Sequence, residues 1–161
     1  MSDFDEQLQK AIERGRQVRA QNDEAAGASA TTEEQLRTFH SQLRNELTER
    51  IEAGLRRLCD LFPGFVYQTV LNETGWGARI SRDDLRLNRG STRTEYSRLE
   101  ILVRPFSETA ILELATKGTI RNRETLNRTN FKFLTEARSE DLIRIVDGIM
   151  LEFAEQYAAQ G

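Results

Sequence analysis

Residues 36–62, LRTFHSQLRNELTERIEAGLRRLCDLF, decide the fold. Apolar side chains recur at every third or fourth position of this stretch, which is the period of one face of an α-helix. They are Leu36, Phe39, Leu43, Leu47, Ile51, Leu55, Leu58 and Phe62. Pro63 and Gly64 end the pattern, because proline cannot continue a helix. The sequence therefore predicts a helix over residues 32–62, roughly 45 Å long at about 1.5 Å per residue.

Short stretches of alternating apolar residues follow this helix and predict strands. The predicted strands cover residues 65–72, 76–81, 98–104, 110–117, 119–125 and 130–134. Residues 83–92 are predicted to be irregular and to end in a turn at 88–91, and Gly118 is predicted to bend the chain. Phe131 and Phe133 are expected to face inward. Because the links between strands are short, the strands should form an antiparallel meander.

The chain ends in a second amphipathic stretch, residues 139–157, which predicts a C-terminal helix. The predicted fold is therefore α+β, with a five- to six-stranded antiparallel sheet. The long helix and the C-terminal helix should pack on the apolar face of that sheet.

The N-terminal part of the chain is predicted to be a separate appendage. Residues 1–20 place Phe4, Leu8 and Ile12 on one side of a short amphipathic helix. Residues 21–31 are small and polar without periodicity, which is typical of a flexible linker. The expected organisation is a tethered helix at 1–20, a linker at 21–31 and a single α+β domain at 32–161.

The long helix is longer than the sheet that it should cover, since an eight-residue strand spans only about 26 Å. The first half of its apolar stripe is therefore expected to bind the tethered helix or a partner. The predicted partner-binding residues are Leu36, Phe39, Leu43 and Leu47, together with Phe4, Leu8 and Ile12.

Composition favours a protein of the cytoplasm. The single cysteine, Cys59, cannot form an internal disulfide, which fits a reducing compartment. The first residues lack the apolar segment of a secretory signal, and no apolar run reaches the roughly 20 residues of a membrane span. We therefore expect neither secretion nor membrane insertion.

Catalytic and metal-binding patterns are scarce. The one histidine, His40, lies nineteen positions before Cys59 on the same predicted helix, a separation of about 28 Å. His40 is expected at a helix surface or interface, and Cys59 is expected to be a small buried residue. Glycine-rich phosphate loops and the usual zinc ligand sets are missing. We expect no cofactor and no metal, and a non-enzymatic role is favoured over an enzymatic one.

The charge distribution provides one further hint. The net charge is −3, yet residues 75–132 hold 12 basic and 7 acidic side chains, between two acidic ends. Arginine suits phosphate and carboxylate groups, so a basic sheet face could bind anions or nucleic acid. The candidate residues are Arg86, Arg89, Arg93, Arg121, Arg123, Arg128 and Lys132. The pI near 5.4 and the inward aromatic residues argue against RNA binding.

Three hypotheses about function follow. The first is a non-enzymatic interaction or assembly module, adaptor- or chaperone-like, that forms a homodimer or binds another protein. The second is a small-molecule-binding protein or enzyme with a pocket between sheet and helices, lined by Trp76, Tyr67, Tyr96 and the segment 86–93. The third is nucleic-acid binding through the arginine-rich face.

Overall fold

The computed structural model describes residues 3–24, 29–88 and 90–160, and within these the side chains of residues 20–24, 29–31, 86 and 88 are not described. The chain divides into two units, Met1–Thr38 and Phe39–Gly161, which are described separately.

The first unit is helical. Helix α1 spans Asp3–Glu24, and helix α2, Ser29–Leu61, begins here and continues into the second unit. The predicted linker at 21–31 is thus helical at 21–24 and at 29–31, and residues 25–28 lie outside the described residues. The apolar side chains of α1 are exposed, Phe4 at 67%, Leu8 at 46% and Ile12 at 48%.

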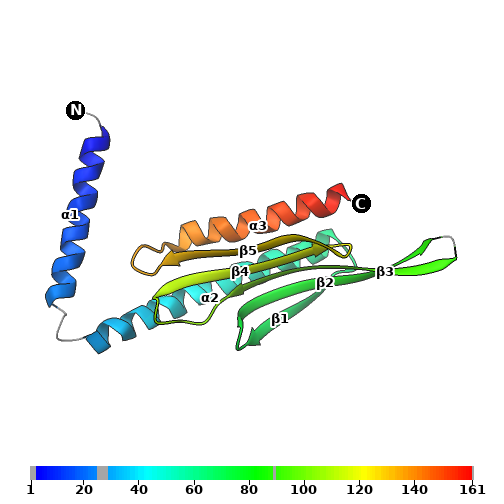
Figure 1. Ribbon diagram of the computed structural model, residues 1–161, viewed down its shortest axis with the longest axis horizontal. Helices are drawn as coiled ribbons and strands as arrows, with labels where there is room; N and C mark the ends of the chain where they lie inside the picture. The colour runs from blue at the N-terminus through cyan, green and yellow to red at the C-terminus, as the bar shows by residue number, and fades with distance from the viewer. Residues whose placement is uncertain (1–2, 25–28, 89, 161) are drawn as a thin grey trace. The chain divides into compact units, whose positions relative to one another are not determined.

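The second unit contains a five-stranded antiparallel sheet in the order β1-β2-β3-β4-β5. Its strands are β1 Val66–Asn72, β2 Gly75–Asn88, β3 Ser91–Val103, β4 Ile111–Ile120 and β5 Arg123–Phe133, and helix α3 spans Ser139–Ala159. Helices α2 and α3 pack on one face of the sheet (Figure 1). The predicted α+β fold with a meander sheet is confirmed.

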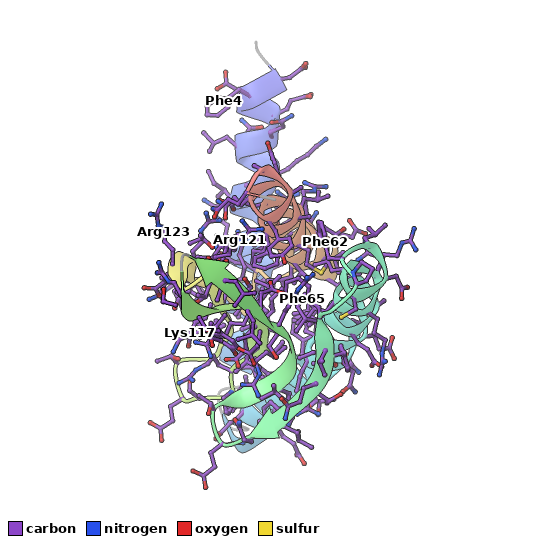
Figure 2. The ribbon with its side chains drawn as sticks, turned by 90° about the vertical axis from the view of Figure 1, so that its right-hand side faces the viewer. Phe4, Phe62, Phe65, Lys117, Arg121 and Arg123 are labelled. Carbon is purple, nitrogen blue, oxygen red and sulfur yellow. The ribbon has the colours of Figure 1, made fainter. Side chains whose placement is uncertain are left out.

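The core of this unit lies between the sheet and the two helices. Leu47, Ile51 and Leu55 of α2 are fully buried, as are Leu99 and Ile101 of β3. Aromatic rings close one end of the core. Phe65 contacts Tyr157 edge-on at a centroid distance of 5.1 Å, and Phe62 contacts the same ring at 5.0 Å. Figure 2 shows Phe62 and Phe65 between the helices and the sheet.

The segment 83–92 differs from its prediction. It is not irregular, because β2 and β3 are 14 and 13 residues long and pair without a break from Trp76↔Val103 to Asn88↔Ser91. Only the turn at its end was correctly predicted. At about 3.3 Å per residue, β2 spans roughly 46 Å. The predicted overhang of α2 assumed strands of eight residues, and β2 is longer than that. The end of the β2–β3 hairpin extends beyond the other strands (Figure 1).

The connection between β4 and β5 also differs. Gly118 does not bend the chain, since β4 runs through it to Ile120. The turn is instead made by Arg121 and Asn122, which both have positive φ angles of 50° and 71°. Two consecutive residues in this conformation form the turn that matches the twist of a β-hairpin. The prediction missed this turn because neither residue is a glycine.

The inward orientation predicted for Phe131 and Phe133 was wrong, since they are 55% and 52% exposed. Lys132 is paired with the buried residue Leu112, so Lys132 occupies the helix-covered face and the two phenylalanines occupy the opposite face. The two rings contact each other edge-on at 5.8 Å.

Candidate functional site

The two edges of the sheet differ in their chemistry. Edge strand β1, VYQTVLN, contains no charged residue, no proline and no glycine, and its register with β2 is continuous. Edge strand β5 contains four charged residues, Arg123, Glu124, Arg128 and Lys132, and has a register shift at Gly118/Thr119 of β4. Charges and bulges are the devices that keep an open sheet edge from pairing with another chain. The edge at β5 has them, and the edge at β1 does not.

The outer edge of β1 is open. Strand β1 is paired with β2 on one side, and among the described residues no backbone group bonds to its other side. Its apolar side chains are exposed at both ends, Val66 at 66% and Leu71 at 70%. A row of backbone donors and acceptors is therefore available beside exposed apolar surface.

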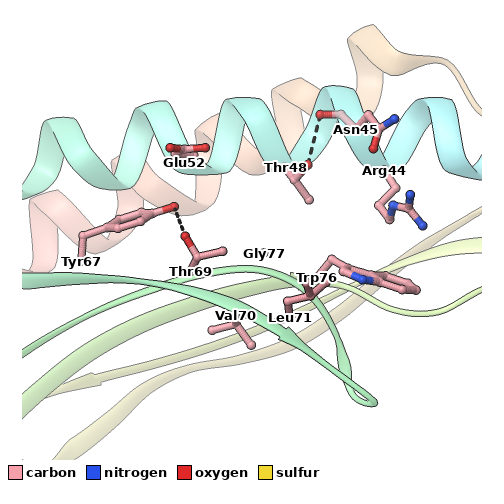
Figure 3. A pocket seen from close by; sticks show the side chains of 10 residues that line it. All are labelled: Arg44, Asn45, Thr48, Glu52, Tyr67, Thr69, Val70, Leu71, Trp76 and Gly77. Carbon is pink, nitrogen blue, oxygen red and sulfur yellow. Dashed lines mark hydrogen bonds between the residues drawn. The ribbon is translucent and has the colours of Figure 1, made fainter.

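A groove of about 310 Å³ lies between α2 and β1, and we call it the α2–β1 groove (Figure 3). Alternation places Tyr67, Thr69 and Leu71 on the helix-facing side of β1, since Tyr67 and Thr69 pair with the buried residues Ile80 and Ala78. The groove is lined by Arg44, Asn45, Thr48, Glu52, Tyr67, Thr69, Val70, Leu71, Trp76 and Gly77.

Two arginines stack on aromatic rings in this region. The Arg44 guanidinium lies 4.6 Å from the centroid of the Trp76 ring, and that of Arg56 lies 4.0 Å from the centroid of Tyr67. Arg56 also donates a 3.1 Å hydrogen bond to Glu52. A stacked guanidinium is held in one orientation and keeps its donor edge for a carboxylate or a carbonyl group. The groove therefore combines polar groups with apolar walls.

The structure brings together part of the predicted pocket. Tyr67 and Trp76 both line the α2–β1 groove. Tyr96 does not, because it lies in β3 opposite Asp83 and is bonded to Asn122 through its backbone. Arg44 and Thr69, which also line the groove, were not predicted from the sequence, because no motif surrounds them. Only the tertiary structure places them beside the open edge of β1.

The predicted partner-binding residues fall into three groups. Leu43 and Leu47 are 3% and 0% exposed and belong to the core. Leu36 and Phe39 are half-buried. The α1 residues Phe4, Leu8 and Ile12 are exposed.

Several predicted anion-binding residues are engaged within the chain. Arg128 forms a 2.6 Å ion pair with Glu152 of α3, and Arg121 donates to the backbone carbonyl of Gln160 and lies 3.7 Å from Glu95. Arg128 therefore lies on the helix-covered face of the sheet, as does Lys132, which was predicted to lie on the opposite face. Arg128 is nevertheless exposed, as are Arg93, Arg123 and Lys132, whereas the Arg86 side chain and Arg89 lie outside the described residues.

His40 is not exposed at a helix surface, the first of the two positions expected for it. It is 2% exposed, and its ring contacts Phe106 edge-on at a centroid distance of 5.7 Å. Burial lowers the pKa of its imidazole, and a hydrogen bond to the Arg104 backbone opposes this shift.

Cys59 is partly buried, and burial raises the pKa of its thiol. Among the described residues, no group of three or more His, Cys, Asp or Glu side chains is arranged to hold a metal.

A second groove lies between α2 and α3 on the side away from the sheet. It has a volume of about 280 Å³ and is mostly apolar, with Leu61 and Leu151 exposed at 57% and 70%.

No described helix has the length and apolarity that crossing a membrane requires.

Comparisons of the chain with protein-family models, with curated proteins and with solved structures give no match.

Proposed function

We propose that this protein is a non-enzymatic interaction and assembly module that self-associates as a homodimer through the outer edge of β1. The observation that supports it is the uncharged, unbulged edge of β1, which contrasts with the charged edge of β5. An open edge of this kind pairs readily with another strand. A protein whose uncharged edge strand stays exposed is prone to aggregate unless a partner covers that strand. Strand addition to such an edge is a common mode of protein recognition.

The neighbouring groove supports the same proposal. An added strand would place alternate side chains on the helix-facing side of the sheet, next to Tyr67, Thr69 and Leu71. The α2–β1 groove provides space there for side chains of ordinary size. The backbone of β1 would supply affinity, and the groove would supply selectivity.

The first unit offers a second apolar surface. Exposed Phe4, Leu8 and Ile12 lie on a helix that is otherwise strongly charged, which is typical of a helix that binds a partner. Leu36 and Phe39 are proposed as further partner contacts. The single cysteine supports a cytoplasmic location.

Light scattering coupled to size-exclusion chromatography tests self-association over a range of protein concentrations. Hydrogen exchange then tests the surface. Alternate amides of β1 point away from β2, and they should exchange slowly at high concentration and quickly after dilution. A protein that stays monomeric at every concentration, with rapid exchange at those amides throughout, would contradict the proposal.

A second candidate function is small-molecule binding in the α2–β1 groove, favoured by the stacking of Arg44 on Trp76. Because Trp76 is the one tryptophan of the chain, its fluorescence reports on the groove directly. Benzoate serves as a planar carboxylate probe. Saturable quenching that disappears in Arg44→Gln would favour this function, and a linear response shared by both proteins would exclude benzoate-like ligands.

A further inference from the structure

We infer that the strand added to β1 is β1 of a second copy, running antiparallel, with the two-fold axis at Thr69. This inference rests on the proposed self-association through β1 and adds the orientation of the paired strands and their register. In a two-fold contact between identical strands, each residue meets a counterpart at equal sequence distance from the centre. With the centre at Thr69, Thr69 lies opposite Thr69 of the second copy, and Tyr67 lies opposite Leu71.

The resulting cross-strand pairs are favourable on the helix-facing side. Tyr67 and Leu71 form an aromatic–aliphatic pair twice, once on each side of the axis, and the threonines form a Thr–Thr pair at its centre. Leu71 is 70% exposed in the single chain and would be covered by the tyrosine of the second copy. On the other side Gln68 meets Val70, and Val66 meets Asn72.

Self-pairing requires that no like charges meet across the axis. Strand β1 satisfies this requirement because it has no charged residue. Strand β5 does not, since antiparallel pairing about its central residue Arg128 would place two arginines opposite each other. The lack of charged residues in β1, in contrast to β5, therefore also favours β1 of a second copy as the strand that pairs with this edge.

The α2–β1 groove can accept the side chains that such a contact brings. Tyr67 and Leu71 of the second copy would enter between β1 and α2, next to Thr48 and Glu52. The two five-stranded sheets would then join into one continuous sheet, with α2 of both copies on the same face.

Charge variants at the axis test this register. Thr69→Lys and Thr69→Glu each place two like charges opposite each other, and each should raise the dimer Kd by about tenfold or more. Mixing the two variants should restore association as a heterodimer, which native mass spectrometry distinguishes from either homodimer. Thr129→Lys is the matched control, since Thr129 is an exposed threonine on β5 and should leave the dimer unchanged. Circular dichroism verifies that every variant is folded.

A cross-link provides an independent measurement. In a Cys59→Ser background, Thr69→Cys should form an intermolecular disulfide under mild oxidation, because directly paired residues have Cα atoms about 4.5–5.5 Å apart. Thr129→Cys should remain unlinked.

The outcomes separate this inference from the proposed function. If the wild-type protein dimerises with slow exchange of the outward β1 amides, but Thr69→Lys and Thr69→Glu dimerise equally well and Thr69→Cys does not cross-link, the register is wrong and the contact through β1 stands. If those amides exchange rapidly in the dimer, the contact through β1 is wrong as well. If the wild-type protein is monomeric at all concentrations, both are overturned.

Discussion

Asn122 holds the backbone of Tyr96 at two points. The Tyr96 amide donates to Asn122 Oδ1 at 2.9 Å, and the Asn122 amide donates to the Tyr96 carbonyl at 2.8 Å. The Asn122 side-chain amide also donates to the Thr94 carbonyl at 2.9 Å. The β4–β5 turn thereby continues the pairing of β3 past the end of β4, and it supports the base of the β2–β3 hairpin.

Replacing Asn122 tests this role. Asn122→Ala removes two side-chain hydrogen bonds and puts a less tolerant residue at a φ of 71°, so we expect a loss of about 1–3 kcal/mol of unfolding free energy. Asn122→Gly keeps the backbone conformation accessible and should lose less. Urea unfolding followed by circular dichroism measures both. Equal losses of unfolding free energy in the two variants would show that the positive φ angle of residue 122 does not contribute to the effect.

Gly77 should tolerate no side chain. A Cβ at this position would lie 2.0 Å from the Ile101 carbonyl oxygen, and a backbone atom of a central strand cannot move aside without disturbing the ladder. Gly77→Ala should therefore destabilise the protein by about 2–4 kcal/mol. Gly148→Ala is the matched control, because Gly148 lies in α3 and a Cβ added there would meet nothing within 4 Å. That variant should gain roughly 0.5–1 kcal/mol from helix propensity. Thermal unfolding of both variants tests the contrast.

His40 should make stability depend on pH. Because burial lowers its pKa below the ordinary value of 6.5, the unfolded chain binds a proton more readily than the native protein. The stability should therefore be complete above a pH of about 6.5 and decrease as the pH falls below it. Since the chain has one histidine, NMR titration of its imidazole protons measures this pKa directly. In His40→Phe the pH dependence in this range should be absent, and an imidazole that titrates at or above 6.5 would refute the prediction.

Cys59 should react slowly with thiol reagents. Burial and the neighbouring Asp60 raise the pKa of its thiol, so the reactive thiolate is scarce at neutral pH. A colorimetric disulfide reagent should label the native protein more slowly than it labels the same chain in concentrated urea. Equal rates in the two conditions would show that Cys59 is accessible and unperturbed.

Local patterns were sufficient for much of the fold. The period of Leu47, Ile51 and Leu55 predicted the long helix and its buried face, and all three are fully buried. Alternation identified Leu99 and Ile101 as core residues of a strand. These predictions succeed because the spacing of apolar residues along the chain follows the period of the helix or strand that they form.

The errors occurred where the local pattern is weak. Beyond Ser81, β2 has two apolar residues, Leu85 and Leu87, among charged and polar ones, so the alternation there is too short to predict a strand. For β5, the order Phe131-Lys132-Phe133 suggested that the rings face inward. The register with β4 instead pairs Lys132 with Leu112, and pairing decides which face is buried.

By itself the sequence determined the α+β class, the two amphipathic helices of the domain and the scarcity of catalytic groups. Tertiary structure decided which of the candidate residues are exposed. It buried Leu43, Leu47 and His40, and it paired Arg128 with Glu152. It also left the uncharged β1 open beside a groove. The physical reason is that periodicity depends on neighbours along the chain, whereas exposure depends on strands and helices that are distant in sequence.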